Sequence, residues 1–323
     1  MSRPQWQSTT WVVVLLNVAL LVILAVINPM FFAYNNLITF IVDAAPLTMV
    51  ALAQTVIILT GGIDLSLGPL LGLVNVIAAS VLVPLGLSGL FVSLLSGVLA
   101  GLVTGAIIAL GRLQPIIVTL AMSSVWSGLA LLIMPQPGGG APQWFILGTT
   151  GFFGAVPMIL VLLVVVAILL WYGFSNTRYG AHVLAIGANE RGAMYSGVSP
   201  AKVKVLTYTL AGGLTAVGAL ILTGSAASGD PTIGPAYTLT SIAAVVLGGT
   251  QLSGGKGSIW HTLGGVLILE LLTQMIFYLG ISSFYQNLIE GLVLIVAMGV
   301  GPVKNLPIFH SEKRVSDAIS SGA

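Results

Sequence analysis

The chain has 323 residues, with only 10 lysine or arginine and 8 aspartate or glutamate residues, while 57% of its residues are apolar. A soluble chain of this length would carry roughly 80 charged residues, so a cytosolic enzyme, a disordered chain and a nucleic-acid-binding protein are excluded. The net charge of +2 is too small to imply an acidic partner. Because there is no cysteine, disulfides and cysteine-based metal sites are excluded as well.

Long apolar runs without alternation predict helices, since lipid offers no partner to an open backbone and a helix needs ~20 residues to cross. We therefore predict an all-α polytopic membrane protein with about ten transmembrane helices, in which a transmembrane domain, 11–301, lies between tails at 1–10 and 302–323. In chain order the predicted spans are 11–30, 37–60, 67–83, 88–111, 115–134, 153–174, 203–226, 237–250, 258–280 and 284–301.

The distribution of basic residues predicts the orientation. Ten spans place the two termini and four of the loops on one side, and that side holds every basic residue of the chain. Since cytoplasmic loops carry the excess of lysine and arginine, both termini are predicted to be cytoplasmic. The basic residues are Arg3, Arg112, Arg178, Arg191, Lys202, Lys204, Lys256, Lys304, Lys313 and Arg314.

The longest predicted cytoplasmic loop, 175–202, contains a stretch typical of a short helix. Asn189 is a favourable N-cap, Glu190 suits the positive N-terminus, and Gly197 suits the position just after the C-terminus. The outward face would present Glu190, Arg191 and Met194. A solvated connector and a docking helix for a cytoplasmic partner are both consistent with this pattern.

Two glycine-rich segments fit the pattern Gly-Gly-x-x-Leu-Ser-x-Gly, and each joins an inward-running span to an outward-running one. Both are predicted to be tight cytoplasmic turns, because glycine permits positive φ and close backbone approach. Such turns are structural, or they also line the inner mouth of a pathway or contact a partner. The residues singled out are Gly61, Gly62, Asp64, Ser66 and Gly68 in the first turn and Gly248, Gly249, Ser253, Gly255 and Lys256 in the second.

Lys256 does not belong to a phosphate-binding loop. Such a loop requires Gly-Lys-Ser/Thr preceded by four residues and a further glycine. Here Thr250 replaces the first glycine and Gly257 follows the lysine. We therefore expect no cofactor on this chain, and any ATPase that drives it must be another chain. The three histidines have no metal-ligand spacing, so no metal site is predicted either.

Three acidic residues fall inside predicted spans, where a charge costs about 2.5–3.5 kcal/mol on insertion scales. They are consistent with a proton relay, with hydrogen bonds between helices, or with a polar lining for a solute path. Hydroxyl, amide and aromatic groups on the spans suit a neutral polyol, although ordinary helix packing also uses them. The candidate lining residues are Asp43, Gln54, Asn75, Ser123, Trp126, Glu270, Gln274 and Glu290.

Three motifs resemble a known family. The stretch 59–68 closely resembles the signature turn of ribose-type permeases in ATP-binding-cassette importers, and 246–258 is similar to the family's second glycine-rich turn. The segment 187–197 resembles its coupling loop, with Gly192 where the family has the first of two alanines. Branched-chain amino-acid permeases are more distant relatives. The resemblance runs from about residue 37 to 301.

The resemblance implies a ten-helix permease subunit in the bacterial inner membrane, which moves a monosaccharide or sugar-like solute by alternating access. It implies a second permease subunit, identical or related, two cytoplasmic ATPase subunits that bind ATP and magnesium, and an extracytoplasmic binding protein; membrane lipid surrounds them. The ATPase pair would push on the short helix of the 175–202 loop. The coupling residues that it assigns are Asn189, Glu190, Arg191, Ala193, Met194, Tyr195 and Ser196.

Two other functions remain open. A proton-coupled secondary carrier would use Asp43, Glu270 or Glu290 as proton sites, and its uptake would collapse with an uncoupler. A membrane scaffold would show neither solute flux nor an associated ATPase. For the importer, the binding protein would dock on the outer loops 135–152 and 227–236, which contain no lysine or arginine.

Overall fold

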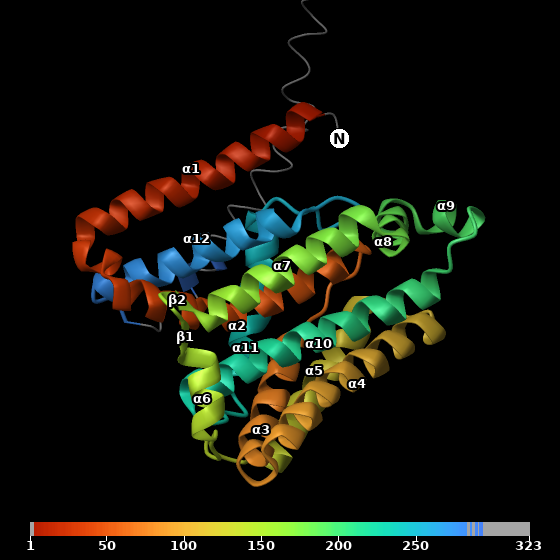
Figure 1. Ribbon diagram of the computed structural model, residues 1–323. Helices are drawn as coiled ribbons and strands as arrows, with labels where there is room; N and C mark the ends of the chain where they lie inside the picture. The colour runs from red at the N-terminus through yellow and green to blue at the C-terminus, as the bar shows by residue number, and fades with distance from the viewer. Residues whose placement is uncertain (1–2, 283–284, 286–287, 290, 293–323) are drawn as a thin grey trace, which may run out of the picture.

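The computed structural model describes residues 3–282, 285, 288–289 and 291–292, with side chains from residue 10 onward (Figure 1). The regular secondary structure of this part of the chain is helical apart from one short hairpin. In chain order the elements are α1 (Arg3–Ile27), η1 (Pro29–Phe32), α2 (Tyr34–Leu59), α3 (Leu67–Leu85), α4 (Leu87–Gly111), α5 (Pro115–Ile133), α6 (Gln143–Thr150), β1 (Phe152–Phe153), β2 (Val156–Pro157), α7 (Met158–Asn176), α8 (Arg178–Ala188), α9 (Glu190–Tyr195), α10 (Pro200–Ala226), α11 (Gly234–Leu247) and α12 (Ile259–Tyr278).

The all-α prediction is confirmed, and the first nine predicted spans correspond to helices. Within the described residues, eight helices are long and apolar enough to cross a membrane, and α11 is a shorter apolar helix of 14 residues. The tenth predicted span, 284–301, falls largely outside the described residues, as do Glu290 and the predicted tail 302–323. The cytoplasmic placement of both termini stays a prediction.

The largest differences in helix boundaries have local causes. The sixth span was predicted to begin at residue 153, but α7 begins at Met158 because Gly154, with φ +63°, turns the chain in the hairpin β1–β2. The eighth span was predicted as 237–250. Instead α11 begins at Gly234, because a proline fits the first helical turn, and it ends before Gly248.

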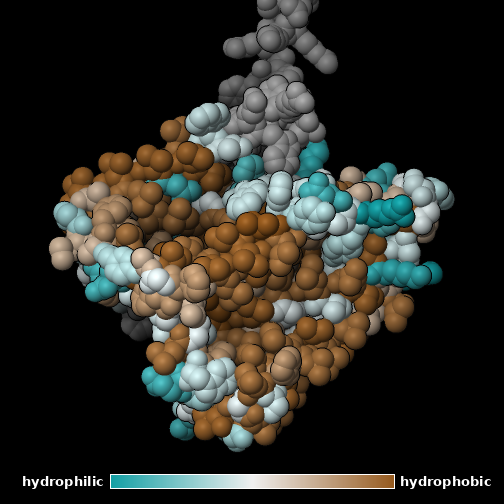
Figure 2. Space-filling view, viewed as in Figure 1, coloured by the Kyte–Doolittle hydropathy of each residue, from teal (hydrophilic) through white to brown (hydrophobic). Residues whose placement is uncertain are grey.

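The helices form a bundle with a central helix and an apolar outer surface. Every residue of α2 from Ala45 to Leu59 is buried, and α3 and α10 also lie mostly inside. By contrast, α1 and α7 expose many large apolar side chains. Figure 2 shows apolar surface over both helices on one face and a group of polar residues near α8 and α9. An apolar exterior of this extent suits lipid rather than water.

Helices α4 and α10 pack closely through small residues. A Cβ added to Gly101 would overlap the Tyr208 carbonyl oxygen, and one added to Gly105 would lie 2.8 Å from the Tyr208 Cβ. A Cβ added to Gly97 would lie 2.6 Å from the Ala216 Cβ. The glycine spacing on α4 therefore serves helix packing within this subunit, which lets the two backbones approach closely.

Candidate functional site

The short helix α9 forms as the sequence predicts. The Asn189 side chain caps it by accepting a hydrogen bond from the Gly192 N–H at 3.0 Å. At the other end the Val198 N–H bonds back to the Ala193 carbonyl (3.1 Å), and Gly197 takes a φ of +85°. Capping at both ends stabilises a helix of only six residues, which would not persist alone.

Six of the seven candidate coupling residues are exposed. Ala193 is the exception and packs inward, while Met194 and Tyr195 are 53% and 85% exposed. Glu190 is exposed as well, but its carboxylate accepts two hydrogen bonds from Lys204 on α10, at 2.7 and 2.8 Å. The surface that α9 offers is therefore the pair Met194 and Tyr195 beside an ion pair within the chain.

The first glycine turn is buried and organised by a carboxylate. Asp64 Oδ1 accepts hydrogen bonds from the N–H and the hydroxyl of Ser66, both at 2.6 Å. The Gln54 amide, in the orientation that satisfies both of its groups, bonds to the backbone N–H and carbonyl of Asp64. Burial raises the Asp64 pKa from 3.8 to about 6, against the opposing effect of the hydrogen bonds from Ser66 and Leu67.

The second turn repeats the first with a shift of one residue. The Gly61 N–H bonds to Ile58 O and the Gly62 N–H to Ile57 O, while Gly249 and Thr250 make the corresponding bonds to Val246 and Val245. Gly61 and Gly249 both have a φ of +81°. The structural partner of Gly61 is thus Gly249, whereas the sequence pattern pairs it with Gly248.

The two turns meet each other, and both meet the end of α8. The Gly255 N–H donates to Leu59 O at 3.0 Å, and a Cβ added to Gly254 would lie 2.6 Å from the Gly61 nitrogen. A Cβ added to Gly187 would overlap both Leu59 O and the Gly255 nitrogen. We call the contact among Gly61, Gly187, Gly254 and Gly255 the glycine junction. Gly187, its residue from α8, lies two positions before Asn189, the N-cap of α9.

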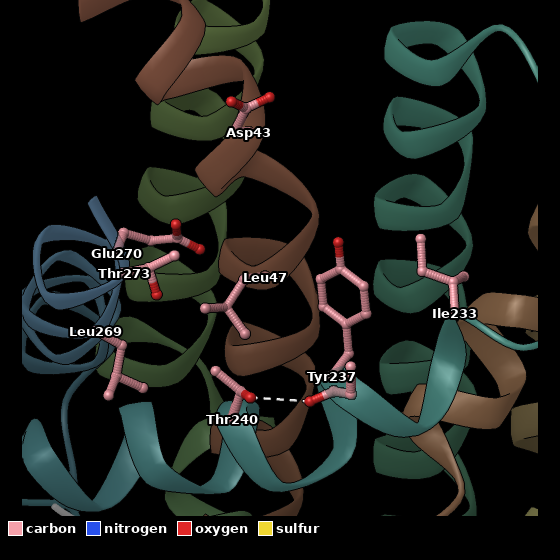
Figure 3. A pocket seen from close by; sticks show the side chains of 9 residues that line it. Asp43, Leu47, Ile233, Tyr237, Thr240, Leu269, Glu270 and Thr273 are labelled. Atoms are coloured by element: carbon pink, nitrogen blue, oxygen red, sulfur yellow. Dashed lines mark hydrogen bonds between the residues drawn. The ribbon is translucent and has the colours of Figure 1, made fainter. Parts of the chain in front are cut away.

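Two of the predicted lining residues meet in a pocket of about 280 Å³ between α2, α11 and α12. Asp43 comes from α2 and Glu270 from α12, and Tyr237 and Thr240 come from α11 (Figure 3). Figure 3 shows the Glu270 carboxylate turned toward the space in front of the Tyr237 ring. The remaining lining residues are Leu47, Ile233, Ala236, Leu269 and Thr273.

The other candidate lining residues lie away from this pocket. Gln54 serves the first turn, and Asn75 anchors the 228–230 loop by donating to Ser228 O (3.2 Å) and accepting from the Asp230 N–H (2.7 Å). Trp126 belongs to the apolar core, and the Ser123 hydroxyl bonds back to its own helix. Gln274 lies one turn beyond Glu270 on α12, outside the pocket lining.

Sequence reasoning missed Tyr237, Thr240, Thr273 and the role of Gly187. The signal for the first three was present, because α11 and α12 carry hydroxyl groups three or four residues from the acid or from one another. Gly187 looked like the beginning of a helix motif, whereas its contacts come from residues far away in the chain. Lys256 is exposed near the junction, and no group of acidic or histidine side chains suited to a metal occurs among the described residues.

The opposite end of the bundle joins the two predicted outer loops. Gly138 and Gly229 exchange two backbone hydrogen bonds, at 3.0 and 2.8 Å, and so form an isolated antiparallel bridge. The first of these loops also contains α6, which contacts α10. The loops 135–152 and 227–236 therefore form one connected surface, on the far side of the bundle from α9 (Figure 1).

Comparison with known proteins agrees with these features. The family described as "Branched-chain amino acid transport system / permease component" matches residues 36–298. A ribose import permease from Bacillus subtilis is 38% identical, covering 86% of this chain and 88% of its own, and one from Escherichia coli K12 is 37% identical, covering 87% and 91%.

An autoinducer 2 import system permease from Salmonella paratyphi A is 30% identical, covering 91% of this chain and 92% of its own. No solved structure matches the chain significantly. The family match contains the two glycine turns, α9 and the pocket, and the relatives align over nearly their whole length. The chain is a multi-pass membrane protein and belongs to this family of transport-system permease components.

Proposed function

We propose that this chain is the membrane subunit of an ATP-binding-cassette importer, and that it moves a monosaccharide or sugar-like solute inward across a bacterial inner membrane by alternating access. The relatives are named for the import of ribose and autoinducer 2, which supports a solute of this kind. Two permease subunits, with ten spans each and cytoplasmic termini, would form the pathway. Two ATPase subunits that bind ATP and magnesium would drive it.

The feature that carries this proposal is α9 together with the glycine junction. An exposed, doubly capped helix with Met194 and Tyr195 on its surface suits docking to a partner, since exposed apolar and aromatic groups dominate binding energy at interfaces. A partner that moves α9 also moves α8. The end of α8 meets the end of α2 and the loop between α11 and α12 without intervening side chains, so the motion passes to both.

The same helices build the pocket. The glycine junction holds the last carbonyl of α2 and the loop that connects α11 to α12, and these three helices line the pocket around Glu270. A displacement of the junction therefore changes how α2, α11 and α12 sit around that space. Close-packed elements shift between discrete arrangements. A small movement at α9 can therefore switch the opening of the pocket from one side of the membrane to the other.

The binding protein would dock at the opposite end of the bundle. The connected loops 135–152 and 227–236 contain no basic residue, so docking there would rely on backbone, hydroxyl and apolar contacts rather than on Lys or Arg. Asp230 is the one charged residue of these loops, and it caps its own turn by accepting from the Thr232 N–H at 2.8 Å.

The test is to remove the apolar pair on α9. In a Met194→Ala/Tyr195→Ala variant we expect the ATPase subunit to co-purify at least ~10-fold less and ATP-dependent uptake in proteoliposomes to fall in parallel, because interface aromatics often contribute 2 kcal/mol or more. Both side chains are exposed, so the thermal stability of the permease should stay nearly unchanged.

The matched control is Phe153→Ala, an aromatic residue that is 77% exposed in β1 at the other end of the bundle. This variant should retain the ATPase. Charge reversal at Glu190 is a poorer test, because it also breaks the ion pair with Lys204; the exchange Glu190→Lys/Lys204→Glu keeps that pair. Full association and uptake in the Met194/Tyr195 variant would show that α9 is not the docking element.

A further inference from the structure

The pocket between α2, α11 and α12 lies within the membrane-spanning helices, and its lining indicates what it binds. Resting on the proposed function above, we infer that this pocket holds the solute within the membrane, and that its solute is an uncharged monosaccharide or a polyol of similar size. The carboxylates of Asp43 and Glu270 would accept hydrogen bonds from the solute's hydroxyl groups, and the Tyr237 ring would cover an apolar face.

The two acids lie at the same depth in the bundle. Asp43 is nine residues from the beginning of α2 and Glu270 is eight residues from the end of α12, which places them ~12–14 Å from the same side at 1.5 Å per residue. That depth is close to the middle of a ~30 Å hydrocarbon layer. A solute site half-way across is what alternating access requires.

The exposure of Asp43 shows that this face does not meet lipid. The side chain is exposed in the described part of the chain, although it lies in the middle of a span, and the Glu270 side chain is half-buried. A carboxylate that faces hydrocarbon is strongly disfavoured, whereas one that faces a water-filled path between subunits is tolerated. The pocket therefore opens toward water or a second subunit.

The chemistry of the lining selects a neutral, hydroxyl-rich occupant. Two carboxylates and the side chains of Thr240, Thr273 and Tyr237 supply acceptors and donors, while Leu47 and Leu269 add apolar lining. No lysine or arginine occurs among the nine residues that line the pocket. An anionic solute such as a sugar phosphate would meet two carboxylates without a compensating positive charge, so it is excluded by repulsion.

The size fits one sugar ring. A volume of about 280 Å³ lies just below the ~300–1,000 Å³ that is usual for the pockets of drug-sized ligands, as expected for a smaller molecule. Hydrogen bonds from hydroxyl groups to a carboxylate are stronger than those to a neutral acceptor, so two acids give orientation as well as affinity. The solute still leaves readily, because the pocket is open rather than sealed.

The first experiment asks whether the pocket reaches water and takes a sugar. The chain has no cysteine, so a single Thr240→Cys substitution gives one reactive site. We expect a water-soluble methanethiosulfonate to label it about tenfold or more faster than Val161→Cys, an exposed position on the apolar face of α7, because the thiolate reacts in water.

Neutral aldoses (D-ribose, D-xylose and D-galactose) are the probes in that experiment. At least one should slow the labelling of Thr240→Cys, whereas D-ribose 5-phosphate should not. Labelling no faster than at Val161→Cys, or labelling that none of the neutral aldoses slows, would overturn the inference. Neither result requires an ATPase, so the outcome stands apart from the proposed function.

The second experiment uses the assembled importer in proteoliposomes with its binding protein. We expect Glu270→Leu to lower uptake by about tenfold or more and Glu270→Gln to lower it less, because an amide still bonds to hydroxyl groups while leucine cannot. ATPase association should be unchanged, since Glu270 lies far from α9. Equal loss in both variants would indicate a proton or cation site and would contradict a polyol site.

The proposed function and the assignment of the pocket can be rejected independently of each other. If wild-type protein shows no ATP-dependent uptake and no associated ATPase, the proposed function is wrong whatever the labelling shows. If the wild-type protein transports in an ATP-dependent way and both Glu270 variants match it, the importer stands and the pocket assignment is wrong.

Discussion

The two glycine turns have similar sequences and different roles in the structure. The first, 61–68, is mostly buried and leads within seven residues from the end of α2 into α3, held by Asp64. The second, 248–257, exposes Gly249, Ser253 and Lys256 and extends as a longer loop before α12. The first turn is a buried connection between α2 and α3. The second is a surface loop in which Gly254 and Gly255 contact the first turn and the end of α2.

The difference shows that the similarity lies in how a helix ends rather than in the whole motif. Both turns use a left-handed glycine two residues after the last helical residue, which satisfies the last carbonyl groups of α2 and α11. Beyond that point they diverge: Asp64 stands where the second turn has Leu252. The conserved element of structure is therefore a cap of about three residues, and the predictions below test what each turn adds to it.

The largest expected effect comes from Gly187, which touches both turns. In Gly187→Ala the new methyl group overlaps backbone atoms of Leu59 and Gly255, which cannot move aside as a flexible side chain would. We expect a loss of about 3 kcal/mol or more in stability and a loss of ATP-dependent uptake, although α9 keeps its surface. Thermal unfolding in detergent and uptake in proteoliposomes measure the two effects.

Gly173→Ala on α7 is the matched control, because nothing lies within 4 Å of the position of its new methyl group. There, alanine should be neutral or stabilise the helix by about 1 kcal/mol. A Gly187→Ala protein as stable and active as the control would show that the glycine junction is not tight and does not transmit motion.

The second prediction concerns Asp64, which is specific to the first turn. Burial raises its pKa from the ordinary 3.8 to about 6 in the folded protein, so the folded state binds more protons between these values. Stability should therefore be highest below pH ~4, fall by about 3 kcal/mol as the pH rises to ~6, and stay at the lower level above.

Three variants separate the charge of Asp64 from its hydrogen bonds. Asp64→Asn keeps an acceptor for Ser66 and should remove this pH dependence, whereas Asp64→Leu should destabilise at every pH, because the Ser66 groups lose their partner. Leu252→Asp places a carboxylate at the half-buried equivalent position in the second turn. It should add a smaller pH dependence of stability than Asp64 causes. Thermal scans from pH 4 to 7 measure the pH dependence of stability in the three variants. An unchanged pH dependence in Asp64→Asn would show that another group causes it.

The sequence predicted features that depend on nearby residues. The nine described spans followed from apolar runs of about 20 residues, and the cap of α9 followed from Asn189, Gly197 and their spacing. These outcomes depend on local physics, in which a helix end is decided by the few residues around it. The existence of α8 before α9 was missed, because 178–188 is too short and too mixed in polarity to stand out as a span.

Features that depend on distant contacts were only partly predictable. The cost of a charge in lipid singled out Asp43 and Glu270, but their meeting across α2 and α12, 227 positions apart, follows from packing alone. The same applies to Gly187, whose restriction comes from Leu59 and Gly255. Gln54 and Asn75 drew notice as polar residues in spans, and the structure uses them to hold a turn and a loop.

The smallest expected effect tests the register of the two turns. Gly61→Ala and Gly249→Ala each force alanine to a φ of +81°, which costs about 1–2 kcal/mol, and the two losses should be similar because the caps are equivalent. Gly248→Ala keeps an ordinary φ, but its methyl group overlaps the His261 carbonyl oxygen, so its loss should be larger and of a different origin. Thermal unfolding of the three variants distinguishes the registers: if Gly61→Ala matched Gly248→Ala rather than Gly249→Ala, the sequence pairing would be the correct one and the one-residue shift would be wrong.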